Sequence, residues 1–260
     1  MSLISSKMLF IFFVVSCLFI VLTPKVKASA NVQILSHTSY MDSFGYYHIV
    51  GEVQNLGDVA VKYVKIVVTF YDSSHTVIAT DFTYSELDVI LPGRKSPFDI
   101  LFTETSQIPR IDHYSLAVTF STTVSKPIGL QILSNSSYID SFGFMHVVGE
   151  IKNIGSIKTT YVKIIATFYD SSGKVVDCDF TFSDPNELDP GQVAPFDIML
   201  TNEERIPLIQ SYALTAESTH YAIIPEFSSM LIMLLFMVLA FLIIHLASKH
   251  RQNIKTRPPF

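Results

Sequence analysis

Apolar and polar residues alternate along much of the chain between residues 31 and 218. Over residues 63–72 every second side chain is apolar, which is the period of a half-buried β-strand, and residues 161–170 show the same pattern. The apolar positions are Val64, Ile66, Val68 and Phe70 in the first segment and Val162, Ile164, Ala166 and Phe168 in the second. The alternation predicts further strands over residues 32–36, 46–54, 77–83, 97–103 and 114–120.

The whole strand pattern occurs twice. Residues 32–118 align with residues 130–216 at a constant offset of 98 without a gap, and about half of the paired positions are identical. A period this long is a small domain rather than a solenoid unit. We therefore expect an all-β fold with two tandem β-sandwich domains over residues 31–120 and 130–218. Because the linker over residues 121–129 is too short for a free tether, we expect an end-to-end arrangement with limited bending.

Glycine and proline mark the predicted strand ends. Pro-Gly at 92–93 and 190–191 has the order that a type II turn requires. Asn-Leu-Gly at 55–57, Asn-Ile-Gly at 153–155 and residues 170–173 supply residues that tolerate positive φ angles. Two glycines interrupt apolar strands and indicate a bulge or a close approach between chain segments. They are Gly51 and Gly149.

The first 30 residues have the layout of a secretory signal peptide. Lys7 precedes an apolar run over residues 8–22, and Ala28-Ser29-Ala30 has small residues where a signal peptidase cleaves. We expect cleavage after Ala30. The alternatives are an uncleaved N-terminal anchor, which the short apolar run disfavours, and lipidation at Cys17, which the apolar residues after it disfavour.

The other end predicts a membrane anchor. Residues 230–247 are 18 positions without Asp, Glu, Lys or Arg, so we expect a stalk over 219–229 and a transmembrane helix over 230–248. Residues 249–260 carry four basic residues and no acidic one, which predicts a cytoplasmic tail. Both ends thus predict a cell-membrane protein whose middle lies outside the cell.

Charge and cysteine content narrow the class of protein. Residues 31–221 hold 22 of the 23 acidic residues but 11 of the 18 basic ones. This acidic ectodomain disfavours nucleic acid as a partner. Once Cys17 leaves with the signal peptide, Cys178 has no partner for an intrachain disulfide. We expect Cys178 to be a small buried residue, with a link between two chains as the alternative.

Two segments of each repeat carry a family resemblance. Gly-Glu-Val-Gln-Asn-Leu-Gly at 51–57 and Phe-Tyr-Asp at 70–72, with residues 149–155 and 168–170 in the second copy, resemble the FxLYD domain family. Positions 68 and 166 hold Val and Ala in place of the motif's first Phe. Such domains are immunoglobulin-like β-sandwiches in exported and membrane-anchored prokaryotic proteins. The resemblance therefore implies that fold and no catalytic activity.

A second resemblance lies before the predicted anchor. Pro225, Glu226 and Phe227, followed by an apolar segment and a basic cluster, resemble the archaeal PEF-CTERM sorting signal. The resemblance implies an archaeal protein and removal of the anchor helix, with transfer to a lipid or surface anchor. Because the tail to Phe260 is longer than in such signals, processing near Pro225 and a retained type I anchor both stay open.

Candidate chemistry is sparse. His48 shares strand parity with Glu52, as His146 does with Glu150, and such pairs either bind a metal or form polar pairs on a solvent face, which we favour. Six aspartates recur near strand ends, where they could bind Ca²⁺, although turn capping is the favoured role. They are Asp72, Asp81, Asp99, Asp170, Asp179 and Asp197. No nucleophile elbow, HExxH motif or Gly-rich phosphate loop occurs, and we expect neither catalysis nor a cofactor. Asn135 begins a glycosylation sequon.

These observations favour a non-enzymatic surface protein that acts in adhesion, envelope structure or recognition of an unknown extracellular or envelope partner. The alternative is an accessory subunit of a membrane transport or secretion complex, and a metal-dependent ectodomain is the least favoured reading. An outward stripe in each copy is a candidate interaction surface, made of Tyr63, Lys65 and Tyr71 and of Tyr161, Lys163 and Tyr169. Partner contacts are also expected where the copies diverge, at 58–62, 87–91 and 104–107 and at 156–160, 185–189 and 202–205.

Overall fold

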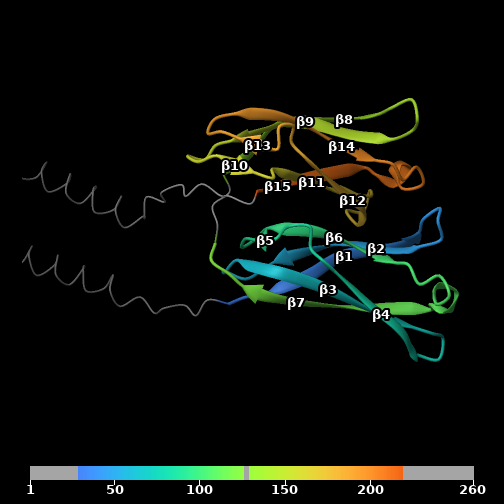
Figure 1. The fold of residues 1–260 in the computed structure, drawn as a ribbon. Coiled ribbons are helices and arrows are strands. Elements are labelled where there is room, and N and C mark those ends of the chain that lie inside the picture. Colours follow the sequence, from blue (N-terminus) through green and yellow to red (C-terminus); the bar gives the residue numbers. More distant parts are fainter. Residues whose placement is uncertain (1–28, 126–128, 219–260) are drawn as a thin grey trace, which may run out of the picture.

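The computed structural model describes residues 29–125 and 129–218 (Figure 1). These residues form an all-β fold of two sandwich-like units, called here the first and the second sandwich. The predicted signal peptide, the transmembrane helix and the motif at 225–227 lie outside the described residues. Within the described ranges, no helix has the length and apolar character needed to cross a membrane.

The first sandwich contains two sheets. Its strands are β1 (Val32–Met41), β2 (Tyr47–Asn55), β3 (Val61–Tyr71), β4 (Val77–Tyr84), β5 (Val89–Ile90), β6 (Lys95–Phe102) and β7 (His113–Thr122). One sheet has the order β1-β2-β6, and in the other β3 pairs with β4, β5 and β7. The strands of both sheets pair antiparallel.

The second sandwich repeats this plan. Its strands are β8 (Leu130–Ile139), β9 (Met145–Asn153), β10 (Thr159–Thr160), β11 (Lys163–Tyr169), β12 (Val175–Phe182), β13 (Glu187–Leu188), β14 (Val193–Leu200) and β15 (Ser211–Glu217). The two main sheets have the orders β14-β9-β8 and β12-β11-β15, and β10 pairs with β13. Short 3-10 turns at Ile108–Arg110 and Ile206–Leu208 precede the last strand of each unit.

Each sandwich encloses its own apolar core, filled from the inward positions of both sheets. The inward parity predicted for β3 and β11 is confirmed, because all eight predicted side chains are 1% exposed or less. The predicted first strand ends too early at residue 36. In the structure β1 continues to Met41, since its polar residues face outward and its backbone keeps pairing with β2 as far as Tyr47.

The turns confirm part of the expectation. Gly93 and Gly191 have φ angles of 77° and 80°, as a type II turn requires. Of the other turn residues that tolerate positive φ, Gly173 has a φ of 79°, whereas no residue at 55–57 or 153–155 has a positive φ. At this turn the buried Asn55 accepts a hydrogen bond from the Gly57 N–H at 3.0 Å and donates to the Ile90 carbonyl at 2.9 Å, so a side chain shapes the turn without a left-handed residue.

Gly51 and Gly149, at equivalent positions of the two repeats, leave room for neighbouring aromatic rings. A Cβ on Gly51 would lie 2.5 Å from Cζ of Phe98 and 2.7 Å from the Ser36 carbonyl oxygen. The rings of Phe98 and of its counterpart Phe196 cover these glycines from the neighbouring strand. The close approach predicted from sequence is therefore confirmed at both glycines.

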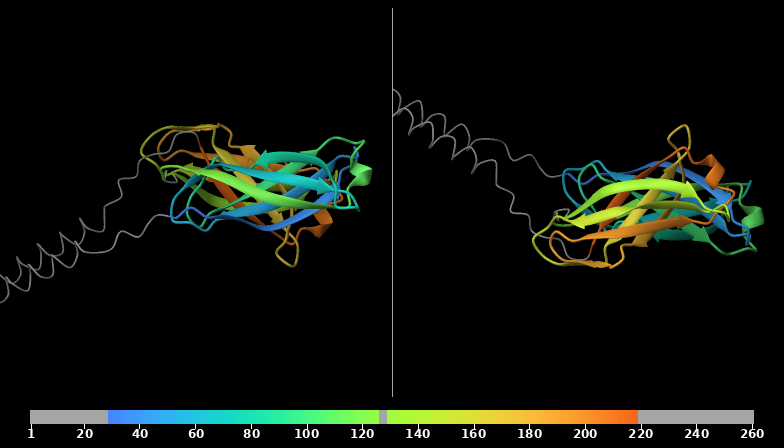
Figure 2. Two further views of the ribbon diagram at one scale, coloured as in Figure 1. Left: turned by 90° about the horizontal axis from the view of Figure 1, so that it is seen from below. Right: turned by 90° about the horizontal axis from the view of Figure 1, so that it is seen from above.

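The two sandwiches lie side by side rather than end to end (Figure 1), which corrects the arrangement expected from the short linker. Views from below and from above show them overlapping along their length (Figure 2). β7 ends at the same end of the molecule at which β8 begins (Figure 1). A short connection can therefore turn the second sandwich alongside the first, where complementary faces meet.

Candidate functional site at the junction of the two sandwiches

The two sandwiches meet through two different sheet faces. Face A is the outer surface of β1-β2-β6 in the first sandwich and of β8-β9-β14 in the second. Face B is the outer surface of the sheet of β3, β4 and β7 in the first sandwich and of β12-β11-β15 in the second. In this chain face A of the first sandwich packs against face B of the second, and contacts of β12 with β1, β2 and β6 form the junction.

A partly buried hydrogen bond crosses the junction. The Tyr169 hydroxyl donates to Oε1 of Glu52 at 2.5 Å, and Nζ of Lys95 lies 2.8 Å from Oε2 of the same carboxylate. The Glu52 side chain is 4% exposed. Burial, reinforced by Glu52, raises the pKa of Tyr169, so the hydroxyl stays a donor. Apolar packing continues beside this bond, because Ile165 of β11 is fully buried together with the core residues of the first sandwich.

Hydroxyl groups of β1 bind the backbone of β12. Oγ1 of Thr38 donates to the Val175 carbonyl at 2.9 Å, and Oγ of Ser36 accepts a bond from the Val175 N–H at 3.3 Å. Val175 itself is fully buried. These paired bonds set the register of the second sandwich along the first, because a slip would leave buried backbone groups without partners.

Charged residues close the end of the junction near the interdomain connection. Nζ of Lys163 lies 2.6 Å from Oε2 of Glu86, and the Glu217 carboxylate accepts bonds from the Asp88 N–H at 3.0 and 3.1 Å. Arg94 donates to the Thr215 hydroxyl and to the Ala216 carbonyl. Burial raises the pKa of Glu217 to about 7 despite the Asp88 hydrogen bond.

Each repeat carries the same Asp-His-Asp cluster on face A. Nδ1 of His48 is 2.9 Å from Oδ2 of Asp99, Nε2 is 3.4 Å from Oδ2 of Asp42, and the imidazole stacks on the Tyr40 ring at 4.8 Å between centroids. Burial opposes a charge on His48, but Asp99 and Asp42 outweigh it and raise its pKa. The cluster can therefore hold a proton between two carboxylates.

The second copy repeats the cluster with distances that agree to 0.1 Å. Nδ1 of His146 is 2.9 Å from Asp197, Nε2 is 3.5 Å from Asp140, and the imidazole stacks on Tyr138 at 4.8 Å. The hydrogen bond to Asp197 raises the pKa of His146 against the opposing effect of burial. The two clusters differ in setting, because the first faces the junction and the second faces outward.

An acidic cleft of about 620 Å³ lies at the edge of the junction, beside the first cluster. Asp177 of β12 lines it with a side chain that is 3% exposed, and its Oδ2 has no hydrogen-bond partner among the described residues. The Arg205 guanidinium lies 4.4 Å from the centre of the Tyr40 ring and donates to the Val176 carbonyl. Cys178 lines the same cleft and is half-buried, whereas a small buried residue was predicted. Burial and the nearby carboxylates raise the pKa of its thiol.

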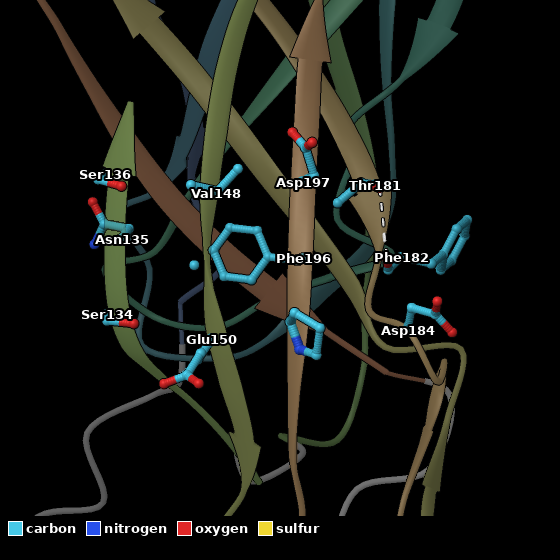
Figure 3. A pocket seen from close by; sticks show the side chains of 12 residues that line it. Ser134, Asn135, Ser136, Val148, Glu150, Thr181, Phe182, Asp184, Phe196 and Asp197 are labelled. Carbon is cyan, nitrogen blue, oxygen red and sulfur yellow. Dashed lines mark hydrogen bonds between the residues drawn. The ribbon is translucent and has the colours of Figure 1, made fainter. Parts of the chain in front are cut away.

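Face A of the second sandwich is uncovered and hollowed. A pocket of about 690 Å³ lies there, and its lining comes from β8, β9 and β14 and from the end of β12, with Thr181 and Phe182 (Figure 3). Ser134 and Ser136 project from β8, Val148 and Glu150 from β9, and Asp197 from β14. The corresponding positions on β1, β2 and β6 of the first sandwich lie in the junction that the second sandwich covers, whereas Tyr84, the counterpart of Phe182, is 50% exposed.

The structure separates the residues that strand parity had paired. His48 contacts Asp99 and Asp42, whereas Glu52 contacts Lys95 and Tyr169, and His146 likewise contacts Asp197 and Asp140. Glu150 is exposed on the uncovered face. Within residues 29–125 and 129–218, no three His, Cys, Asp or Glu side chains are placed to hold a metal ion.

The six recurring aspartates have three separate roles and do not converge. Asp72 and Asp170 accept backbone N–H groups across a turn, for example that of Ser74 at 3.0 Å and that of Ser172 at 2.8 Å. Asp81 and Asp179 accept the N–H of the following residue. Asp99 and Asp197 bind the histidines described above.

The predicted outward stripes need two corrections. Lys163 and Tyr169 point out of their own sandwich, but in the junction they bind Glu86 and Glu52. Lys65 and Tyr71 lie on the uncovered face B of the first sandwich. Tyr63 and Tyr161 are exposed but do not continue the stripe. Both have positive φ, 51° and 52°, and β3 has a register shift between Lys62 and Lys65, which turns the aromatic ring away from the line of the strand.

Asn135 lies on β8 at the edge of the uncovered pocket, where its Oδ1 accepts a hydrogen bond from the Tyr212 hydroxyl at 2.9 Å. In the first copy His37 and Tyr114 make the equivalent contact at 2.8 Å. The sequon side chain is exposed.

Sequence reasoning missed two residues of the junction, Asp177 and Glu217, and included Arg205 only as the end of a divergent segment. Asp177 and Arg205 stand where the first copy has Ala79 and Gln107, and Glu217 stands where it has Thr119. The signal that could have found them was this divergence within an otherwise conserved repeat. Two of the divergent segments proposed as partner contacts, 87–91 and 202–205, do touch the other sandwich, through Asp88 and Arg205.

No protein-family model and no curated protein matches this sequence. Among solved structures, red sea bream transglutaminase aligns at 5% identity with a TM-score of 0.24, over 76% of this chain and 30% of that one. The exo-chitosanase CsxA of Amycolatopsis orientalis aligns at 12% identity with a TM-score of 0.26, over 72% of this chain and 26% of that one. The chain thus spans less than a third of the length of either enzyme, and likeness at this level assigns no activity.

Proposed function

We propose that the protein is a non-enzymatic cell-surface protein. Its two immunoglobulin-like domains of the FxLYD type are anchored to an archaeal membrane and recognise an envelope or extracellular partner. The observation that carries the proposal is the uncovered face A of the second sandwich. It keeps the polar groups and the hollow shape of a face that already functions as a binding surface in the first sandwich. Broad sheet faces of this kind bind macromolecules through many contacts rather than one reactive centre.

The positions of the chain ends support anchoring at one end. The described chain begins and ends at the same end of the molecule (Figure 1). A membrane anchor after residue 218, as the sequence predicts, would therefore hold both sandwiches abreast at one distance from the membrane. The hairpins at 42–46, 72–76, 140–144 and 170–174 would face away from it.

Surface labelling tests the topology. A membrane-impermeant amine reagent is applied to intact cells that express the full chain, and modified lysines are identified by mass spectrometry. Lys62 and Lys152 are expected to be labelled, while Lys249 is not. An intact mass that begins at Asn31 would support signal cleavage, and a mass that ends near Pro225 would support removal of the anchor. Labelling of Lys249 with protection of Lys62 would overturn the proposed topology.

Photo-crosslinking tests the binding surface. A photoreactive amino acid is placed at Ser136 on the uncovered face A, and the matched control carries it at Thr38, the equivalent position inside the junction. The Ser136 probe is expected to give adducts with another chain, and the Thr38 probe adducts within its own chain. Equal intermolecular yields at the two positions would contradict a binding role for the uncovered face. Adducts confined to one integral membrane complex would favour the accessory-subunit alternative.

A further inference from the structure

The junction uses two different surfaces, so it leaves one copy of each unused. Face A of the first sandwich and face B of the second are covered, whereas face B of the first and face A of the second remain open. An interface between unlike surfaces is heterologous, and such an interface can repeat from one molecule to the next. The internal duplication thus places both halves of a second, equivalent interface on the outside of every chain.

The open face A keeps many of the side chains of the covered one, although Gln192 and Val193 replace Arg94 and Lys95. Eight positions correspond, and seven are identical: Ser36/Ser134, Thr38/Ser136, Tyr40/Tyr138, His48/His146, Val50/Val148, Glu52/Glu150, Pro97/Pro195 and Asp99/Asp197. Their burial differs. Val50 and Glu52 are 0% and 3% exposed under the second sandwich, whereas Glu150 and Pro195 are exposed.

The open face B keeps the groups that make the central contacts. Lys163, Thr167, Tyr169 and Val175 correspond to Lys65, Thr69, Tyr71 and Val77, and Ile165 corresponds to Val67. Val175 is fully buried, while Val77 is 53% exposed. The lysines are held alike, with Nζ of Lys163 lying 4.0 Å from the centre of the Phe180 ring and Nζ of Lys65 lying 3.5 Å from that of Phe82.

We propose that a second copy of this chain occupies the uncovered face A, by docking face B of its first sandwich there. The contacts of the internal junction then recur between chains. Tyr71 donates to Glu150, Lys65 pairs with Asp184, and the backbone of Val77 bonds to the hydroxyls of Ser134 and Ser136. The charges are complementary, since the lysine comes from one surface and the carboxylates from the other.

The contacts that do not recur make the interface between chains weaker than the one within the chain. Arg205 and Glu217 of the junction are replaced by Gln107 and Thr119 on the open face B, and Arg94 is replaced by Gln192 on the open face A. The Tyr71 ring also stacks on His113, for which the second copy has Ser211. The covalent connection raises the effective concentration within a chain but not between chains. We therefore expect association that depends on concentration.

The geometry of the repeat sets the form of the assembly. The two sandwiches lie parallel, because residues at the hairpin end of one, such as Thr38, contact residues at the hairpin end of the other, such as Val175. Near the interdomain connection, Asp88 likewise contacts Glu217. Repetition therefore keeps the chain ends of every copy on one side and yields a lateral ring or filament. Its placement on one membrane rests on the surface anchoring proposed above.

Thiol crosslinking in membranes that contain the full chain tests this proposal. The background chain carries Cys17→Ser and Cys178→Ala. Tyr71→Cys and Glu150→Cys together are expected to give a ladder of dimers and larger species with a short bis-maleimide. Two chains that each carry one of these substitutions are expected to stop at the dimer when co-expressed. Either single variant alone is expected to stay monomeric.

The internal junction supplies the matched control. Glu52→Cys with Tyr169→Cys is expected to crosslink within one chain and to keep the monomer mass. Ser136→Arg added to the double variant is expected to abolish the ladder, while Ser171→Arg, on a hairpin outside both faces, is expected to leave it. The proposal is overturned by a missing ladder, by dimers of a single variant alone, which indicate like-to-like contact, or by failure of the internal control pair.

The two proposals fail separately. Surface labelling of Lys62 without any ladder would refute the self-assembly and leave the surface role intact. A ladder from a chain whose Lys62 is protected in intact cells would support the copy-to-copy interface and refute the proposed localisation.

Discussion

Replacing Asp177 by asparagine is expected to stabilise the protein at alkaline pH. Burial raises the pKa of Asp177 from 3.8 to about 7, although the Cys178 N–H donates to its Oδ1 at 2.8 Å. The carboxylates of Asp99 and Asp179 raise the pKa further, and Arg205 opposes them. Because Oδ2 has no partner among the described residues, the ionised form loses hydration without compensation.

The magnitude follows from proton linkage. One pKa unit corresponds to about 1.4 kcal/mol, so a rise from 3.8 to about 7 amounts to about 4 kcal/mol against the folded state when Asp177 is ionised. Below pH 3.8 the carboxyl group is protonated in both states and contributes no difference. Between this value and about pH 7 only the folded state keeps the proton, so stability falls as pH rises and the full cost is present above pH 7.

Asparagine keeps the shape of the side chain and cannot ionise. It also gives up the attraction to Arg205, so we expect a gain of about 2 kcal/mol at pH 8, which disappears toward pH 4. Urea unfolding of residues 29–218 at pH 5 and pH 8 measures this, with far-UV circular dichroism as the signal because the chain has no tryptophan. Asp81→Asn, at the position equivalent to Asp179, is the control and is expected to change little. A gain that is equal at both pH values, or a loss at pH 8, would refute the reasoning.

Three further predictions test the junction and the repeated elements. Tyr169→Phe leaves Oε1 of Glu52 without its 2.5 Å hydrogen bond and is expected to cost about 1–3 kcal/mol of unfolding free energy. Tyr71→Phe on the open face B is expected to cost less than about 0.5 kcal/mol. Similar losses for the two variants would contradict the role of Tyr169 in the junction. Gly51→Ala places a methyl group against the Phe98 ring, so we expect a loss of about 1–3 kcal/mol in the same assay, and an unchanged unfolding midpoint would show that the ring moves freely. Asp197 raises the pKa of His146, so the stabilising contribution of the charged imidazole is present below about pH 6.5 and is lost as pH rises through the folded-state pKa. The difference in unfolding free energy between wild type and His146→Gln should therefore be larger at pH 5 than at pH 8. The reverse order would be inconsistent with the Asp-His-Asp cluster.

Local structure could be read from the sequence wherever one local rule decided it. The inward parity of β3 follows from alternation alone, because a strand buried on one face must place every second side chain in the core. The type II turn at 92–93 follows from the fixed φ of proline and the freedom of glycine. The turn at 55–57 does not follow from the same rule. The buried Asn55 side chain shapes it by hydrogen bonds, without a residue of positive φ.

The candidate site was less accessible to prediction. His48 was recognised, but its partner was not, because Asp99 is 51 residues away and reaches it only through the pairing of β2 with β6. Tyr169 was recognised as outward-facing, which is correct for its own sheet. Its partner Glu52 lies on the other sandwich, and no pattern within one strand reports on such a contact.

The sequence by itself determined that this protein is built from two copies of one β-unit, and it determined which side chains of each strand fill the core, since both follow from periodicity. Only the tertiary structure decided that the copies lie side by side, with unlike faces joined. The physical reason is that alternation tells a strand's inside from its outside but does not say whether the outside meets water or another sheet. Equivalent residues such as Val77 and Val175 therefore read identically in the sequence, and one is exposed while the other is buried.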